Sequence, residues 1–170
     1  MPEKISVLFV CLGNICRSTM AEGVFQSVAR KEPYTEFFDK IDSCGTAAYH
    51  VGDTPDYRTM MTLENNGITD YVHRGRQLQK ADFDKFDYIF AMDRSNLIGV
   101  ERVAQSKPGS KAKVMLWGEY AGGKKGPEIV EDPYYGGDRG FTTVYDQCRR
   151  FTANFLRDVV PGVEVPEKLA

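Results

Sequence analysis

The sequence predicts an α/β fold, a single domain in which helices cover both faces of an open parallel sheet. The chain has 170 residues, the usual length of one domain. Short β-rich apolar runs alternate along it with longer segments of helical periodicity. Strands that alternate with helices favour a parallel sheet, because each crossover helix returns the chain to the same edge.

Four segments have the composition of strands. The first, Ile-Ser-Val-Leu-Phe-Val, is a continuous apolar run, as expected for a strand that is buried on both faces. The others contain shorter apolar or β-branched runs that are separated by helical segments. The four predicted strands cover residues 5–10, 38–43, 86–92 and 112–117.

The helices are predicted from their apolar periodicity and from their start and stop signals. Thr19 with Glu22 fits a capping box, Thr54 before Pro55 fits a second helix start, and Asp93 fits a third. A glycine-rich stretch over 118–126 interrupts the pattern, and the tail from 161 to 170 is expected to fray. The predicted helices cover about 18–31, 54–67, 93–104 and 139–159.

Composition excludes several classes of function. The net charge of −2 and the isoelectric point of about 5.7 give no general attraction to nucleic acid or membrane. No apolar run is long enough to cross a bilayer, and no signal-peptide cleavage site is evident. Without an export signal we expect a cytoplasmic protein whose four cysteines are free thiols.

The segment with the strongest functional signal joins the first strand to the first helix. It contains Cys11, Leu12, Gly13, Asn14, Ile15, Cys16, Arg17 and Ser18. Backbone N–H groups in such a turn can form an anion-binding nest, and the helix N-terminus adds about half a positive charge. Gly13 and Asn14 tolerate positive φ, and Arg17 can bind a phosphate with two parallel hydrogen bonds.

Cys11 would lie at the bottom of this nest. The donors around it favour a thiolate, which is a competent nucleophile, and they also stabilise the charge on a transferring phosphoryl group. A cysteine at a strand end is more often a buried small apolar residue, and Cys-x5-Arg spacing alone is common. The position between a buried strand and a helix start favours the functional interpretation.

A leaving group needs a proton, and Asp132 is the candidate donor. It lies in the segment Glu-Asp-Pro-Tyr-Tyr-Gly after the fourth predicted strand. An acid there could protonate the leaving oxygen and then take a proton from water. An Asp before Pro133 is also common in ordinary turns, so the residues alone leave both interpretations open. Tyr134 and Tyr135 could form the walls of a slot for an aromatic ring.

At these residues the sequence resembles the low-molecular-weight protein tyrosine phosphatases, also known as acid phosphatases. The resemblance covers nearly the whole chain and includes residues 7–18, 41–43, 86–88, 92–93 and 131–136. It implies a flavodoxin-like sheet of four parallel strands in the order 2-1-3-4. It also implies hydrolysis of phosphotyrosine through a phosphocysteine on Cys11, with Arg17 binding phosphate, Asp132 as acid and base, and no metal or cofactor.

The resemblance also assigns supporting roles. Asn14, Ser18, Ser43 and His73 match a network that holds the loop in shape, and Ser18 matches the hydroxyl that bonds the thiolate. Leu12, Tyr49, Tyr134 and Tyr135 are expected to line the substrate slot, whereas His50 receives no role. Residue 19 is Thr where the family commonly has Pro. Thr is a good cap residue, so the helix start should survive.

Cys16 suggests redox protection. It lies in the same loop as Cys11, so it could capture an oxidised Cys11 as a disulfide and prevent irreversible oxidation. The alternative is an ordinary buried thiol.

Two rival functions stay open at this point. A thiol-dependent arsenate reductase uses a similar loop, but residues 80–92 lack the relay cysteines that it needs. A binding module could hold phosphate without turnover. Zinc-site spacing and a Walker motif are both absent. The expected partners are phosphotyrosine proteins or small aryl phosphates, with no nucleic acid and no membrane, and the protein is expected to be a monomer.

Overall fold

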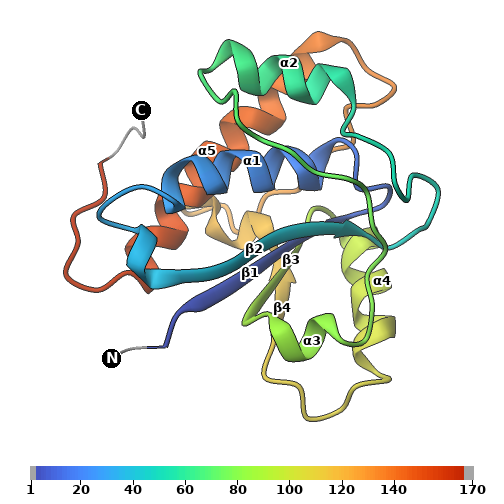
Figure 1. Ribbon diagram of the computed structural model, residues 1–170, viewed down its shortest axis with the longest axis vertical. Coiled ribbons are helices and arrows are strands. Elements are labelled where there is room, and N and C mark those ends of the chain that lie inside the picture. Colours follow the sequence, from blue (N-terminus) through green and yellow to red (C-terminus); the bar gives the residue numbers. More distant parts are fainter. Residues whose placement is uncertain (1–2, 167–170) are drawn as a thin grey trace.

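The computed structural model confirms the four-stranded parallel sheet. It describes residues 3–166. All strand pairs are parallel, and the strand order β2-β1-β3-β4 matches the expectation (Figure 1). The strands are β1 (Ile5–Cys11), β2 (Phe38–Gly45), β3 (Tyr88–Ala91) and β4 (Lys113–Leu116).

Helices lie on both faces of the sheet, as predicted (Figure 1). On one face α1 (Arg17–Ala29) packs against α2 (Tyr57–Asn65) and α5 (Asp138–Val159). The other face carries α3 (Asp82–Lys85) and α4 (Arg94–Ala104). The sequence did not predict α3, which has a single turn and therefore no periodicity to detect. Residues 3–166 also include two 3-10 helices, Thr35–Phe37 and Trp117–Ala121.

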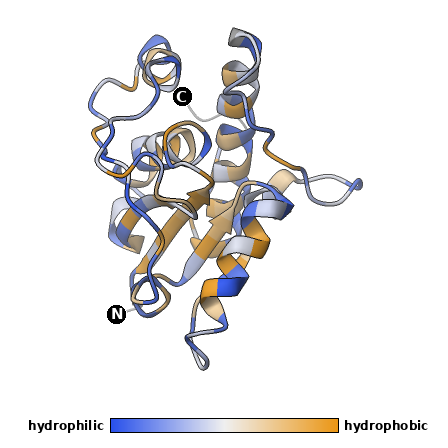
Figure 2. Ribbon diagram, turned by 90° about the vertical axis from the view of Figure 1, so that its right-hand side faces the viewer, coloured by the Kyte–Doolittle hydropathy of each residue, from blue (hydrophilic) through white to orange (hydrophobic). Residues whose placement is uncertain are grey.

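Strand β1 separates two apolar cores because its side chains alternate between the faces of the sheet. Val7, Phe9 and Cys11 belong to the larger core, under α1 and α5, and Leu8 and Val10 belong to the smaller one. Figure 2 shows the apolar strands between helices whose outer faces are polar. Cys11 is therefore directed to the α1 side, where the chain turns into the next helix.

Aromatic rings fill the larger core beneath the site. The indole of Trp117 lies 4.6 Å from the ring of Phe90 and 5.0 Å from that of Phe9, measured between centroids. All three side chains are fully buried, and each buried aromatic ring of this kind contributes roughly 2 to 3 kcal/mol of transfer free energy. The strand that ends at Cys11 is thus fixed along its length by rigid packing.

Two predicted helix starts were wrong. Thr19 and Glu22 do not form a capping box, because α1 already begins at Arg17. Both residues therefore lie within α1, and both are buried. The second helix begins at Tyr57, with Asp56 as its cap, so the predicted cap Thr54 lies outside it. Proline at position 55 made the earlier start plausible, but Asp56 is an equally good cap residue. The third start, with Asp93 as cap of α4, is confirmed.

The expectation of a frayed tail from residue 161 does not hold for the part that the structure describes. Val165 is buried in the larger core, and Arg157 of α5 donates hydrogen bonds to the carbonyls of Val165 and Pro166. The apolar side chain of Val165 was a sign of burial in this segment. The prolines and charged residues around it are typical of an exposed tail. Residues 167–170 lie outside the described range.

Candidate active site

The strand–helix loop and the Asp132 loop meet at the carboxyl end of the sheet. They enclose a cavity of about 220 Å³. This is the edge at which open parallel sheets bind ligands. The cavity brings together residues that lie more than a hundred positions apart. Its lining consists of Cys11, Leu12, Gly13, Ile15, Cys16, Arg17, Tyr49, His50, Asp132, Tyr134 and Tyr135.

The backbone of the loop is turned so that its carbonyl groups face outward. Thr46 N–H donates to Cys11 O over 2.9 Å, and Ala47 N–H donates to Leu12 O over 3.0 Å. On the other side Asp56 N–H donates to Ile15 O over 2.9 Å. With its carbonyls bonded to neighbouring loops, the turn presents N–H groups to its concave side, which is the arrangement of an anion nest.

Two residues make this sharp turn possible. Asn14 has φ of +58°, in the left-handed region that asparagine tolerates better than most residues. Gly45 lies opposite Cys11 on β2, and a Cβ atom there would come within 2.7 Å of Leu12 O. Only glycine therefore allows the loop to pack this closely against the end of β2.

The sulfur of Cys11 lies among hydrogen-bond donors at the base of the cavity. Its side chain is only 3% exposed. Ser18 Oγ lies 3.0 Å from Cys11 Sγ, and Asn14 N–H donates to the same sulfur over 3.3 Å. The sulfur therefore has two hydrogen-bonding partners, both from the strand–helix loop and the start of α1.

Arg17 is buried and held by neighbouring strands and loops. One nitrogen, Nη1, donates to Asp93 Oδ2 over 2.7 Å and to Val130 O over 3.1 Å. The other, Nη2, lies 3.9 Å from Asp132 Oδ2. The guanidinium is thus anchored on one edge, and it lines the cavity beside the acid.

Asp132 enters the cavity from the opposite loop, and its side chain is 42% exposed. Its Oδ1 atom accepts a hydrogen bond from Tyr134 N–H over 3.0 Å, an Asx turn that fixes the carboxylate relative to its own loop. The remaining oxygen, Oδ2, is the one nearest Arg17. Asp132 therefore lines the same cavity as Cys11, with one carboxylate oxygen bonded within its own loop and the other near Arg17.

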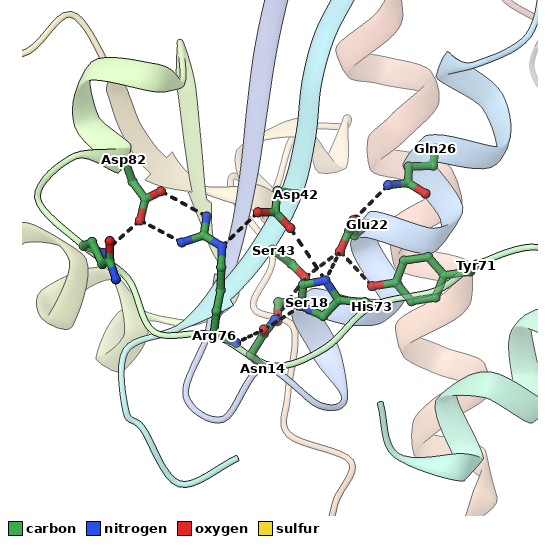
Figure 3. Close-up of polar contacts among 11 residues, drawn as sticks. Asn14, Ser18, Glu22, Gln26, Asp42, Ser43, Tyr71, His73, Arg76 and Asp82 are labelled. Carbon is green, nitrogen blue, oxygen red and sulfur yellow. Dashed lines mark hydrogen bonds and ion pairs between the residues drawn. The ribbon is translucent and has the colours of Figure 1, made fainter. Parts of the chain in front are cut away.

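The predicted supporting residues lie close together (Figure 3), and none of them is among the residues that line the cavity. Asn14 Nδ2 donates to Ser18 Oγ over 2.8 Å and to Ser43 Oγ over 3.0 Å. Asn14 Oδ1 can only accept, so the contact of 2.7 Å to His73 Nε2 places a proton on that ring nitrogen. The structure thus brings all four supporting residues together around the amide of Asn14.

Glu22 extends this network. From the sequence it was expected only as part of a helix cap, so its role at the site was not predicted. Its Oε1 atom accepts from Ser43 Oγ and from Tyr71 Oη, each over 2.7 Å, and lies 3.3 Å from His73 Nδ1 (Figure 3). Burial raises the pKa of Glu22 to about 7, and burial also raises the pKa of Tyr71. Burial lowers the pKa of His73, so burial disfavours the charged form of both members of this pair.

Cys16 lies in the cavity wall and its carbonyl fixes the start of α1. That carbonyl accepts from Met20 N–H, from Thr19 Oγ1 over 3.0 Å and from Thr59 Oγ1 over 3.2 Å. The helix therefore starts normally with Thr at position 19. The Thr19 hydroxyl does not cap the helix but donates to the carbonyl of Cys16, three residues earlier. Burial, with the carboxylate of Asp56 adding to it, raises the pKa of the Cys16 thiol well above its usual value.

The predicted rim residues all line the cavity, but they differ in exposure. Leu12 and Tyr134 are 45% and 40% exposed, and Tyr49 and Tyr135 are 77% and 92% exposed. His50, which received no role in the sequence, also lines the cavity, and its ring packs over Gly13. His50 Nδ1 lies 3.0 Å from Asp53 Oδ2. In the sequence, a histidine three residues before an aspartate did not indicate a function.

Among the described residues, Glu22, Asp42 and His73 bring potential metal ligands within 4.8 Å of one another. These atoms are already engaged within the protein. Glu22 Oε1 accepts two hydrogen bonds, and Asp42 Oδ2 accepts from Arg76 Nε over 2.8 Å (Figure 3). The group is therefore accounted for as a hydrogen-bonded support of the loop.

Fold and site together define a class of protein. It is a flavodoxin-like α/β domain whose first strand–helix loop forms an anion nest around a cysteine, faced by an acid from a late loop. This fold carries many unrelated functions, so membership of a family has to come from the sequence and the site.

Comparisons with known proteins supply that step. Residues 6–164 match the family profile described as low molecular weight phosphotyrosine protein phosphatase. The protein of that name from Schizosaccharomyces pombe is 54% identical over 160 residues, which cover 94% of this chain and 99% of the relative. The chain therefore belongs to the low molecular weight phosphotyrosine protein phosphatase family.

Solved structures agree with this assignment of the fold. A protein tyrosine phosphatase from Entamoeba histolytica aligns with a TM-score of 0.83 and 35% identity, over 94% of this chain and 99% of the other. The Drosophila arginine phosphatase DARP aligns with the same TM-score and 38% identity, over 94% of this chain and all of the other. Because relatives carry different substrate names, substrate preference has to be argued from the cavity.

Proposed function

We propose that this protein hydrolyses phosphate monoesters, chiefly phosphotyrosine in proteins, through a phosphocysteine intermediate on Cys11. The observation that carries the proposal is that Cys11, Arg17 and Asp132 line one cavity, with Arg17 Nη2 3.9 Å from Asp132 Oδ2. The family name supports the same activity. No metal ligand or organic cofactor enters the proposed steps.

In the first step the thiolate of Cys11 attacks phosphorus in line. A sulfur–phosphorus bond forms as the phosphorus–oxygen bond to the tyrosine breaks. Arg17 and the backbone N–H groups of the loop bind the equatorial oxygens, where the charge of the transition state is spread. Asp132 gives its proton to the leaving phenolate, which departs as the neutral phenol.

In the second step water attacks the phosphocysteine. Asp132, now a carboxylate, takes a proton from this water as the new oxygen–phosphorus bond forms. The sulfur–phosphorus bond breaks, and Cys11 leaves as a thiolate that Ser18 and Asn14 stabilise. Inorganic phosphate is released and the enzyme returns to its starting state.

The rim supports an aromatic leaving group. Tyr49, Tyr134 and Leu12 give the cavity apolar walls around its polar floor, and a phenyl ring packs favourably against such surfaces. Small aryl phosphates fit the same description, because they place the same ring and phosphate in the cavity.

The direct test is hydrolysis of p-nitrophenyl phosphate and of a phosphotyrosine peptide. We expect turnover that EDTA does not change and that alkylation of Cys11 stops. A protein that binds phosphate but leaves both esters intact would contradict the proposal, and so would activity that survives alkylation.

We also propose that Cys16 protects Cys11 from irreversible oxidation. Hydrogen peroxide would convert the Cys11 thiolate to a sulfenic acid, and attack by Cys16 sulfur would form a disulfide and release water. All four cysteines are free thiols in the structure, and the raised pKa of Cys16 keeps it from reacting first. Peptide mapping after peroxide should show a Cys11–Cys16 link, and thiol should restore activity in wild type but not in Cys16→Ser.

The cellular setting follows from the same residues. Among residues 3–166 no helix is both long and apolar enough to cross a membrane. Free thiols at a catalytic cysteine require a reducing compartment, so we propose a cytoplasmic protein, and we propose that it acts as a monomer. Fractionation of cells and sedimentation equilibrium test these two proposals.

A further inference from the structure

Arg58, in the first turn of α2, connects the two loops that form the cavity. Its guanidinium donates from Nε to Asp56 Oδ1 and from Nη2 to Asp56 Oδ2, each over 3.0 Å. Its third nitrogen, Nη1, donates to Tyr134 O over 3.1 Å. One side chain thus bonds both the start of α2 and the loop that carries Asp132.

On one side, Arg58 is tied to the phosphate-binding loop. Asp56 N–H donates to Ile15 O over 2.9 Å, and Thr59 Oγ1 donates to Cys16 O over 3.2 Å. The Asp56 carboxylate that caps α2 also accepts from the Arg58 side chain. The first turn of α2 is therefore fixed to the loop that holds Cys11.

On the other side, Arg58 is tied to the acid through a single residue. Tyr134 N–H donates to Asp132 Oδ1 over 3.0 Å, and Tyr134 O accepts from Arg58. The backbone of Tyr134 is thus held at both ends, by the acid and by the arginine. A shift of Tyr134 would move the carboxylate of Asp132 with it.

Ring contacts fix the orientation of the guanidinium. Its central carbon lies 4.6 Å from the ring centroid of Phe141, in the buried face of α5, and 5.3 Å from that of Tyr134. The Arg58 side chain is 21% exposed, so these contacts are partly shielded from solvent. Only the planar guanidinium of arginine, with its several N–H donors, can bond the Asp56 carboxylate and the Tyr134 carbonyl while it stacks on a ring. The ammonium group of lysine cannot do this.

We propose that Arg58 is a positioning residue that sets the place of the general acid Asp132 relative to Cys11. The inference rests on the proposed phosphatase function. Arg58 does not contact the reacting atoms, so its loss should leave the nucleophile and the phosphate site in place. It should instead weaken proton donation to the leaving group, as expected when a catalytic group is displaced by about 1 Å.

The test compares an ester that needs the acid with one that does not. Phenolate is a poor leaving group and needs protonation, whereas p-nitrophenolate leaves readily. In Arg58→Met we expect the ratio of kcat/KM for p-nitrophenyl phosphate to that for phenyl phosphate to rise about 10-fold. Arg58→Lys should raise the ratio as well, because an ammonium group cannot make all three contacts.

The ratio separates positioning from a loss of folded protein, which would lower both rates equally. Arg102→Met on the exposed end of α4 is the matched control, and its ratio should equal that of wild type. A wild-type ratio in both Arg58 variants contradicts the inference. Failure of wild type to hydrolyse either ester would instead contradict the proposed function.

A double-mutant cycle tests whether Arg58 acts through Asp132. When Asp132→Ala has removed the acid, there is nothing left for Arg58 to position, so adding Arg58→Met should leave the ratio unchanged. A further 10-fold rise in the double variant would mean that Arg58 acts on the substrate by another route, which would overturn the inference.

Discussion

The two loops that form the cavity are built in opposite ways. Most residues of the loop over 11–18 are buried, its carbonyls are bonded to neighbouring loops, and its shape depends on close packing against the end of β2. The loop over residues 131–137 is largely exposed, and contacts through Tyr134 hold it near the site. In the proposed mechanism the nucleophile Cys11 therefore has a preorganised site, whereas the proposed acid Asp132 belongs to a loop that is open to solvent.

The largest effect is expected where the rigid loop holds the nucleophile. Cys11→Ser replaces a thiolate by a hydroxyl that stays protonated in the same nest. Turnover of p-nitrophenyl phosphate should fall by at least about 10⁴-fold, while vanadate or phosphate should still bind. Cys148→Ser, in the core away from the cavity, is the control, and comparable loss there would show that any buried thiol matters.

A smaller and more selective effect is expected from the exposed loop. Asp132→Ala should lower kcat/KM by about 10² to 10⁴, with the larger loss for esters that have poorer leaving groups. Steady-state rates with a series of substituted phenyl phosphates measure this dependence. An equal loss for every ester would assign Asp132 to phosphate binding, and unchanged rates would mean that another group is the acid.

The rigidity of the nucleophile loop is itself testable at Asn14. Asn14→Ala removes the hydrogen bonds to Ser18, Ser43 and His73 and leaves a strained backbone, so the free energy of unfolding should fall by about 3 kcal/mol. Asn14→Gly should recover about 1 kcal/mol, because glycine adopts positive φ without strain. Urea denaturation measures both, and equal stabilities for the two variants would rule out backbone strain.

The smallest effect concerns the proton behind the rigid loop. The unfolded chain releases the proton of Glu22 near its ordinary pKa of 4.5, whereas the folded protein keeps it to about pH 7. At this group only the unfolded state loses a proton between these values, so Glu22 makes the free energy of unfolding fall as pH rises.

Glu22→Gln has nearly the same side-chain shape but cannot titrate. Between pH 5 and 7 its free energy of unfolding should decrease by roughly 1 to 3 kcal/mol less than that of wild type. Glu64→Gln on the exposed face of α2 is the matched control and should leave the slope unchanged. Urea denaturation at several pH values gives the slope. A slope in Glu22→Gln equal to that of wild type would show that Glu22 does not exchange its proton in this range.

The same contrast explains what the sequence could predict. The nucleophile loop is continuous in the chain, so a strand, Cys11, Arg17 and Ser18 in close succession were enough to recognise it. Asp132 needed the family resemblance, since an acid before proline has no local signal that distinguishes it from a turn. The strand order followed from the same resemblance, and the strands themselves from their composition.

The residues that the sequence missed act through tertiary contacts. Glu22 looked like a cap because its spacing from Thr19 is right, and only burial against Ser43 and Tyr71 reveals its place. Arg58 has an ordinary position on a half-exposed helix, and its partner Tyr134 lies 76 residues away. Asp93 was predicted only as a helix cap. Its contact with Arg17 could also have been expected, because Asp93 follows a strand at the edge where ligands bind.

The most direct test of the central claim is to trap the covalent intermediate. The enzyme is mixed with a phosphotyrosine peptide and quenched within milliseconds, and the phosphorylated residue is located by mass spectrometry. Phosphate should be found on Cys11, in an amount that matches the burst of released tyrosine peptide. Turnover without any phosphocysteine, or phosphate on another residue, would contradict the account.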